Sequence, residues 1–126
     1  LARKFVEGIK NNKKSIEIWG NGKQIRSFLY IEDCIKATDL LFKSKFRDPM
    51  NIGSDKHVTI NKLVTILEKI SGKKFKRKYD ISKPQGVKSR SSDNTLIKKI
   101  LHWSPKIKIE DGMERIFYHI QNEHDG

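Results

Sequence analysis

The apolar residues of the chain recur with two different periods. In some segments they return every three or four positions, as on one face of a helix, and in others they alternate or run together, as in a strand. The helical segments cover about 1–9, 31–42, 60–70, 94–101 and 110–120. The extended segments cover 15–19, 24–30, 50–53 and 75–79. Because the two kinds alternate along the sequence, the pattern predicts an α/β architecture.

The second helical segment is expected to bury one stripe of side chains. Its apolar stripe consists of Ile31, Cys34, Ile35, Thr38, Leu41 and Phe42. Cys34 lies on this stripe, so we interpret it as a small core residue rather than a nucleophile. A reactive thiol needs exposure and a cationic neighbour, and neither is indicated here.

Polar residues and glycines mark the ends of several elements. A tight turn is expected at 20–23, where glycines tolerate positive φ. Thr59 is placed to cap the third helix and Gly72 to end it. Asp93 is expected to cap the fourth helix. The side chains expected to face inward on that helix are Leu96, Ile97, Ile100 and Leu101.

The composition and net charge of the chain narrow the range of functions and partners that we expect. The 126 residues suit one domain, and 27 Lys and Arg against 15 Asp and Glu give a formal net charge of +12. Such an excess favours a polyanionic partner, either nucleic acid or a phosphorylated small molecule. A solvated lysine-rich surface would give the same charge, so the excess alone does not decide between these.

The sequence lacks the features expected of membrane, secreted or metal-binding proteins. The longest apolar runs are far shorter than the roughly 20 residues that cross a bilayer, and no apolar leader is seen. Cys34 is the single cysteine and cannot form an internal disulfide, which suits a reducing compartment. The four histidines lie at no metal-ligand spacing. We therefore expect a cytoplasmic protein with no membrane span and no metal site.

The densest basic run, Lys73–Lys78, allows two interpretations. With Phe75 among its lysines it suits a nucleic-acid patch, and with Phe75, Arg77 and Tyr79 alternating it suits an edge strand protected by lysines. We favour the edge strand, because a nucleic-acid module usually shows a recognisable reader motif and none is found.

The familiar cofactor and catalytic motifs are incomplete. Gly20 and Gly22 begin a dinucleotide fingerprint, but Ile25 stands where its third glycine belongs. Tyr79 and Lys83 have the spacing of a dehydrogenase Tyr-Lys pair, which works only on a helix. Pro84 disfavours a helix at Lys83, so we do not expect that pair to be catalytic.

Three cations are better placed for chemistry. Lys4 lies on the first helix, Arg26 follows the glycine turn and Arg90 lies in a polar loop. The planar guanidinium suits bidentate contact with phosphate oxygens. Sequence spacing alone does not show that the three converge.

Several separated motifs together resemble one family. They are the stretch WGNGKQIRSFLYIED at 19–33, NIGSD at 51–55, PQGVKSRSSDNTLI at 84–97 and LHWSP at 101–105. In this order they resemble the nucleotide-sugar epimerases and dehydratases, which are extended short-chain dehydrogenase/reductases. Within that family the chain is most similar to the epimerases that act on GDP-mannose.

The resemblance implies a Rossmann-type fold of which this chain is one part. It implies that 1–126 is the carboxyl-terminal, nucleotide-sugar-binding region, without the glycine-rich half that binds NAD. Segment 31–54 is then expected to pack on the sheet of that cofactor domain. NAD is implied for the intact enzyme and not for this chain alone, so the isolated chain is not expected to be catalytic.

The resemblance also implies a substrate site. Lys4, Gln24, Ile25, Arg26 and Arg90 match positions along the nucleotide diphosphate, with GDP-mannose or a similar nucleotide sugar as substrate and a homodimer in the intact enzyme. The family's threonine is replaced by Ile25, so only a backbone contact is expected there. Rival interpretations are a stand-alone nucleic-acid module that uses Lys73–Lys78 and a truncated product without activity.

Overall fold

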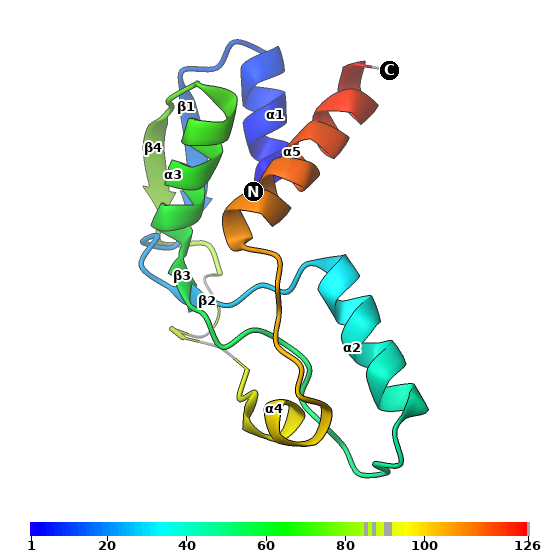
Figure 1. Cartoon of the computed structure of the whole chain (residues 1–126). Coiled ribbons are helices and arrows are strands. Elements are labelled where there is room, and N and C mark those ends of the chain that lie inside the picture. The colour runs from blue at the N-terminus through cyan, green and yellow to red at the C-terminus, as the bar shows by residue number, and fades with distance from the viewer. Residues whose placement is uncertain (85, 87, 90–91, 126) are drawn as a thin grey trace.

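The computed structural model describes residues 1–84, 86, 88, 89 and 92–125 and contains helices and short strands in alternation (Figure 1). The elements are α1 (Ala2–Lys10), β1 (Ser15–Trp19), β2 (Ile25–Arg26), α2 (Ile31–Lys43), β3 (Val58–Thr59), α3 (Ile60–Ser71), β4 (Lys76–Asp80), α4 (Thr95–Leu101) and α5 (Ile109–Asp125). The predicted α/β architecture is confirmed.

Two small sheets join parts of the chain that lie far apart in sequence. β1 pairs with β4 in parallel, with Ser15 opposite Lys76 and Trp19 opposite Asp80. β2 pairs with β3 in antiparallel fashion. A parallel pair needs a crossover between its strands, and here β2, α2, β3 and α3 supply it. Among the described residues β4 pairs only with β1, so it is an edge strand, as expected.

The main core lies among α1, α3, α5 and the β1–β4 sheet. Its most deeply buried large side chains are Phe5, Val64, Leu67 and Phe117. The rings of Phe5 and Phe75 meet edge to face with their centroids 5.0 Å apart. In Figure 1 these three helices gather beside the β1–β4 sheet at one end of the molecule.

The helix ends largely follow the predicted signals. The Thr59 hydroxyl accepts a hydrogen bond from the Lys62 N–H at 3.1 Å and caps α3. Gly72 ends α3 with a left-handed φ of 70°. At α4 the cap position is Asn94, one residue later than predicted. The Asp93 carboxylate still accepts from the Thr95 N–H at 3.0 Å, so its expected role is retained.

A second, smaller core lies between α2 and α4. Ala37, Ile97 and Trp103 are buried in it. The Asp33 carboxylate, only 1% exposed, accepts hydrogen bonds from the N–H groups of Lys106 at 3.2 Å and Ile107 at 2.9 Å. This buried carboxylate therefore joins α2 to the segment that leads into α5.

The predicted burial of the α2 stripe is wrong. Ile31, Ile35 and Phe42 are 59%, 60% and 85% exposed, and Cys34 is half-buried rather than in a core. The residues that α2 buries are Asp33 and Ala37. The helix forms as predicted, but among the described residues no element covers its apolar face. Leu96 and Ile100, expected to face inward on α4, are also exposed.

Two predicted strands are not formed in full, because the described residues do not supply partners for them. Segment 50–53 is not a strand, and of the extended segment 24–30 only β2 pairs. A strand exists through hydrogen bonds to a neighbour, and the apolar pattern does not provide the neighbour. Within the described residues β3 lies alongside β2 for two residue pairs only.

Candidate functional site

A cavity of about 260 Å³ lies at the amino end of α1, beside the end of β1 and the start of β2. Its lining residues are Leu1, Lys4, Glu17, Ile18, Trp19, Gln24, Arg26, Ile60 and Pro84. Lys4, Gln24 and Arg26 are predicted site residues, and Lys4 lies 20 positions before Gln24 in the sequence. The structure brings these three together in one cavity.

The glycine turn before β2 sets the position of Gln24. Gly22 has a φ of 74°, and a Cβ there would come within 2.2 Å of the Asn61 Oδ1. The Asn61 N–H donates to the Gly22 carbonyl at 2.9 Å, and the Tyr79 hydroxyl donates to the Asn61 Oδ1 at 2.6 Å. The turn is therefore fixed against both α3 and β4, and only glycine fits at its tip.

The Asn21 side chain forms a hydrogen bond within this turn. Its Oδ1 accepts a hydrogen bond from the Lys23 N–H at 2.8 Å. This is the bond that a short carboxylate makes in an Asx-turn, and an amide oxygen makes it equally well. The Asn21 side chain therefore stabilises this turn.

Gln24 is a buried polar residue with one unsatisfied atom. Its side chain is 7% exposed, and its Nε2 donates to the Trp19 carbonyl at 3.0 Å. Its Oε1 is buried and accepts no hydrogen bond from the described residues. A buried acceptor without a partner costs about 1–3 kcal/mol. A ligand that donates a hydrogen bond to this oxygen would recover that free energy.

Lys4 and Arg26 supply the positive charge of the cavity. The Lys4 ammonium lies 5.1 Å from the centroid of the Trp19 ring and 3.4 Å from the Glu17 carbonyl oxygen. The Arg26 Nη1 donates to the Ile25 carbonyl at 2.7 Å, and its Nη2 lies 3.1 Å from the position that a Cβ of Gly86 would occupy. The loop after β4 thus packs against the guanidinium.

The predicted substrate contacts of the other two site residues, Ile25 and Arg90, are not tested by the structure. Ile25 does not line the cavity, and its N–H donates to the Lys88 carbonyl at 2.9 Å. A contact between Ile25 and substrate stays a prediction. Arg90 lies outside the described residues, so its predicted contact also stays untested.

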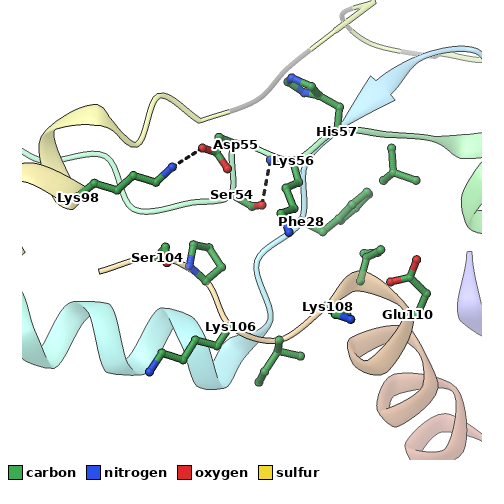
Figure 2. Close-up of a pocket in the computed structure, with 14 residues that line it drawn as sticks. Phe28, Ser54, Asp55, Lys56, His57, Lys98, Ser104, Lys106, Lys108 and Glu110 are labelled. Carbon is green, nitrogen blue, oxygen red and sulfur yellow. Dashed lines mark hydrogen bonds and ion pairs between the residues drawn. The ribbon is translucent and has the colours of Figure 1, made fainter. Parts of the chain in front are cut away.

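A larger cavity of about 490 Å³ lies between the loop before β3 and the segment before α5. Lys98 and Asp55 pair across one wall at 2.7 Å, and this hydrogen bond from Lys98 holds the pKa of Asp55 below its ordinary value. Figure 2 shows the Lys106 side chain directed away from this pair. The lysines of this cavity therefore do not converge on one point, and sequence reasoning gave no signal for it.

The remaining sequence motifs have structural roles in this fold. Tyr79 is on a strand and bonds Asn61, so it forms no dehydrogenase-like pair with Lys83. Arg77 turns inward from the basic run and its Nη2 pairs with the Glu68 carboxylate at 2.7 Å. Among the described residues no cluster of three His, Cys, Asp or Glu could hold a metal. None of the helices in that part of the chain is long and apolar enough to cross a membrane.

Comparison with protein families decides which family these features belong to. A family model described as GDP-mannose 4,6 dehydratase matches residues 2–116 of the chain. The chain belongs to this family. Membership in the GDP-mannose 4,6 dehydratase family confirms the resemblance that the separated motifs predicted.

Curated relatives of this dehydratase family place the match more finely. GDP-mannose 3,5-epimerase 1 of Oryza sativa subsp. japonica is 37% identical over 119 residues, which are 94% of this chain and 31% of the relative. GDP-mannose 3,5-epimerase of Arabidopsis thaliana is 35% identical over the same length, again with 94% of this chain and 31% of the relative. The chain therefore spans about a third of these relatives.

Solved structures of similar proteins confirm the fold. UDP-glucuronic acid 4-epimerase from Bacillus cereus, in complex with UDP-glucuronic acid and NAD, superposes with a TM-score of 0.85 at 29% identity, over 98% of this chain and 40% of that chain. UDP-glucose 4-epimerase from Thermotoga maritima gives 0.78 at 26% identity, over 95% and 38%. The fold of this dehydratase-family chain is thus part of a Rossmann-type extended short-chain dehydrogenase.

Proposed function

We propose that this chain is the substrate-binding portion of an NAD-dependent nucleotide-sugar epimerase or dehydratase, and that the cavity at Lys4, Gln24 and Arg26 binds the nucleotide diphosphate. The observation that carries the proposal is that Lys4 of α1 lines the same cavity as Gln24 and Arg26, which lie at the start of β2. The family match and the epimerase relatives support the same activity class.

The charges of the cavity suit a diphosphate. A diphosphate within a nucleotide sugar carries about two negative charges, which an ammonium and a guanidinium together neutralise. The guanidinium of Arg26 offers two parallel donors to phosphate oxygens, and the Lys4 ammonium acts as a point charge. The Oε1 of Gln24 has no hydrogen-bond partner among the described residues, so a hydroxyl of the nucleotide sugar, and not the diphosphate, is the group that could donate to it. The site thus combines charge with one oriented hydrogen bond.

We propose GDP-mannose or a similar GDP sugar as the substrate. Support comes from the curated relatives at 35–37% identity, which are GDP-mannose 3,5-epimerases. The similar solved structures include epimerases of UDP sugars. The alternative substrate is therefore a UDP sugar, in which uracil replaces guanine as the base. The choice between the two is open to direct binding measurements.

The NAD of this family does not fit the described residues of this chain. The Gly20 to Gly22 turn has no third glycine, and its tip is packed against Asn61 and Tyr79, which leaves no space for a cofactor phosphate. We propose that NAD binds to a cofactor domain outside this sequence.

Segment 31–54 is proposed to dock on the sheet of that cofactor domain. Support comes from the exposed apolar side chains of α2, chiefly Ile31, Ile35 and Phe42, and from the unpaired extended run at 50–53. An apolar face and an unpaired backbone both gain free energy when a sheet covers them. The homodimer and the cytoplasmic location stay predictions.

Calorimetric titration of the purified chain with GDP-mannose tests the site. Arg26→Ala and Lys4→Gln should each weaken binding about tenfold or more, because a lost charged hydrogen bond costs about 1.5–3 kcal/mol. Arg90→Ala tests the remaining predicted cation in the same way.

Matched controls exist for both variants. Arg47→Ala and Arg3→Gln remove exposed charges far from the cavity or on the outer side of α1, and each should stay within about twofold of wild type. Equal affinity of Arg26→Ala and wild type would disprove the proposed site. Binding of a short single-stranded oligonucleotide in preference to GDP-mannose would favour the rival basic module.

A further inference from the structure

Two lysine ammonium groups lie near the half-exposed indole ring of Trp19. The Lys4 Nζ lies 5.1 Å and the Lys83 Nζ lies 5.8 Å from the ring centroid. Lys4 belongs to α1, and Lys83 lies in the segment that follows β4. The ring therefore holds together two cations from distant parts of the chain. A cation is attracted to the face of an indole, so this arrangement has a physical cause.

Lys83 reaches this position through the turn at the end of β4. Its N–H donates to the Asp80 carbonyl at 3.3 Å, which fixes the turn. The next residue, Pro84, lines the cavity that contains Lys4 and Arg26. The Lys83 side chain is thus at the rim of that cavity. No motif in the sequence indicated this, because Tyr79 and Lys83 matched only a catalytic spacing that the structure does not support.

The residues that line this cavity include two cations, Lys4 and Arg26, and one carboxylate, that of Glu17. Among the described residues no carboxylate forms an ion pair with the ammonium of Lys4 or of Lys83. The nearest acid along the chain is Asp80, whose carboxylate accepts hydrogen bonds from the Ser82 N–H and hydroxyl. These bonds, and the neighbouring Lys83 charge, hold the pKa of Asp80 below its ordinary value. The Asp80 carboxylate is thus ionised, and it is hydrogen-bonded to Ser82.

We propose that Lys83 is a further diphosphate-binding residue, positioned by the same Trp19 ring that Lys4 contacts. The inference rests on the proposed function of the same cavity and adds a cation that the family motifs do not include. Two ammonium groups and one guanidinium at one rim repel each other, and a divalent anion placed among them relieves that repulsion. Trp19 acts here as a positioning residue.

The test compares charge-matched variants of the chain in calorimetric titrations with GDP-mannose. Lys83→Gln should weaken binding about tenfold, at the lower end of the cost of a lost charged hydrogen bond. Lys73→Gln removes the same charge from an exposed residue in the segment between α3 and β4 and should stay within about twofold of wild type. Lys83→Arg keeps the charge and should recover most of the affinity.

Two further measurements separate a phosphate contact from a change in structure. Guanosine, which lacks the diphosphate, should bind Lys83→Gln and wild type equally. In a Trp19→Leu background the effect of Lys83→Gln should shrink, because the ring no longer positions the ammonium, and the double-mutant cycle measures this coupling. Circular dichroism of each variant establishes that the fold is retained.

The outcomes distinguish the two proposals. If wild type binds GDP-mannose and Lys83→Gln binds it equally well, the role of Lys83 is wrong and the proposed function stands. If Lys73→Gln weakens binding as much as Lys83→Gln, the effect is one of net charge and the inference is overturned. If wild type binds neither GDP-mannose nor UDP-glucuronic acid nor pyrophosphate, the proposed function fails and the inference fails with it.

Discussion

The two ends of the molecule contrast in how they bury apolar surface. At one end α1, α3, α5 and the β1–β4 sheet enclose Phe5, Leu67 and Phe117 almost completely. At the other end α2 and α4 share only a small core, and Phe42 on α2 is 85% exposed. Both ends contain amphipathic helices, α1 and α3 at one end and α2 at the other. The contrast teaches that an apolar stripe predicts a face that needs covering without saying what covers it.

The largest expected effect is a difference in stability between two variants, one with a phenylalanine truncated at each end of the molecule. Phe117→Ala should destabilise the chain by about 3–5 kcal/mol, because it opens a cavity in a closed core. Phe42→Ala should change the free energy of unfolding by less than about 0.5 kcal/mol, because the ring is already in solvent. Denaturant unfolding of both variants measures the difference. A large cost for Phe42→Ala would show that α2 is covered in solution, for example by self-association, and would remove the contrast.

An intermediate effect is expected at the carboxylate that joins the two ends. Asp33→Asn keeps the shape but weakens two bonds from backbone N–H groups, so it should cost about 1.5–3 kcal/mol. Asp39→Asn on the same helix affects only an exposed pair with Lys43 and should cost less than about 1 kcal/mol. Thermal or denaturant unfolding compares the two. Equal stability of the two variants would mean that Asp33 does not connect the ends.

The smallest expected effect concerns pH at the less closed end. Lys98 lowers the pKa of Asp55 in the folded chain, so the pair contributes stability above the ordinary Asp pKa and loses it as pH falls through the lowered value. The pair is about half exposed, and its contribution should be less than about 1 kcal/mol. Asp55→Asn should therefore flatten the loss of stability below about pH 4. An unchanged acid limb in this variant would contradict the assignment.

Local signals predicted the elements well. The helices and β1 follow from the spacing of apolar residues, and Thr59 and Gly72 mark the ends of α3 through hydrogen bonds within a few residues. Such signals act over one or two turns, so they can be interpreted without knowing the tertiary structure. The errors at Phe42 and 50–53 have the opposite origin, because burial and strand pairing depend on distant or absent partners.

The candidate site was only partly predictable for the same reason. Lys4, Gln24 and Arg26 were found through the family resemblance, while their spacing could not show that they meet. The spacing of Tyr79 and Lys83 matches a catalytic motif, but the sequence predicts no catalytic role for Lys83 and gives no sign of a binding role. Its position beside Trp19 arises from the parallel pairing of β1 with β4, which no local pattern encodes.

The parallel pairing of β1 with β4 also bears on the order in which the chain folds. β1 precedes its partner β4 along the chain, with β2, α2, β3 and α3 between them. Closing so long a loop costs conformational entropy before any hydrogen bond of the pair is gained, which slows folding. During synthesis β1 and the apolar face of α1 therefore wait unpaired until β4 and α5 emerge. We expect this interval to be the period in which the chain depends most on chaperones.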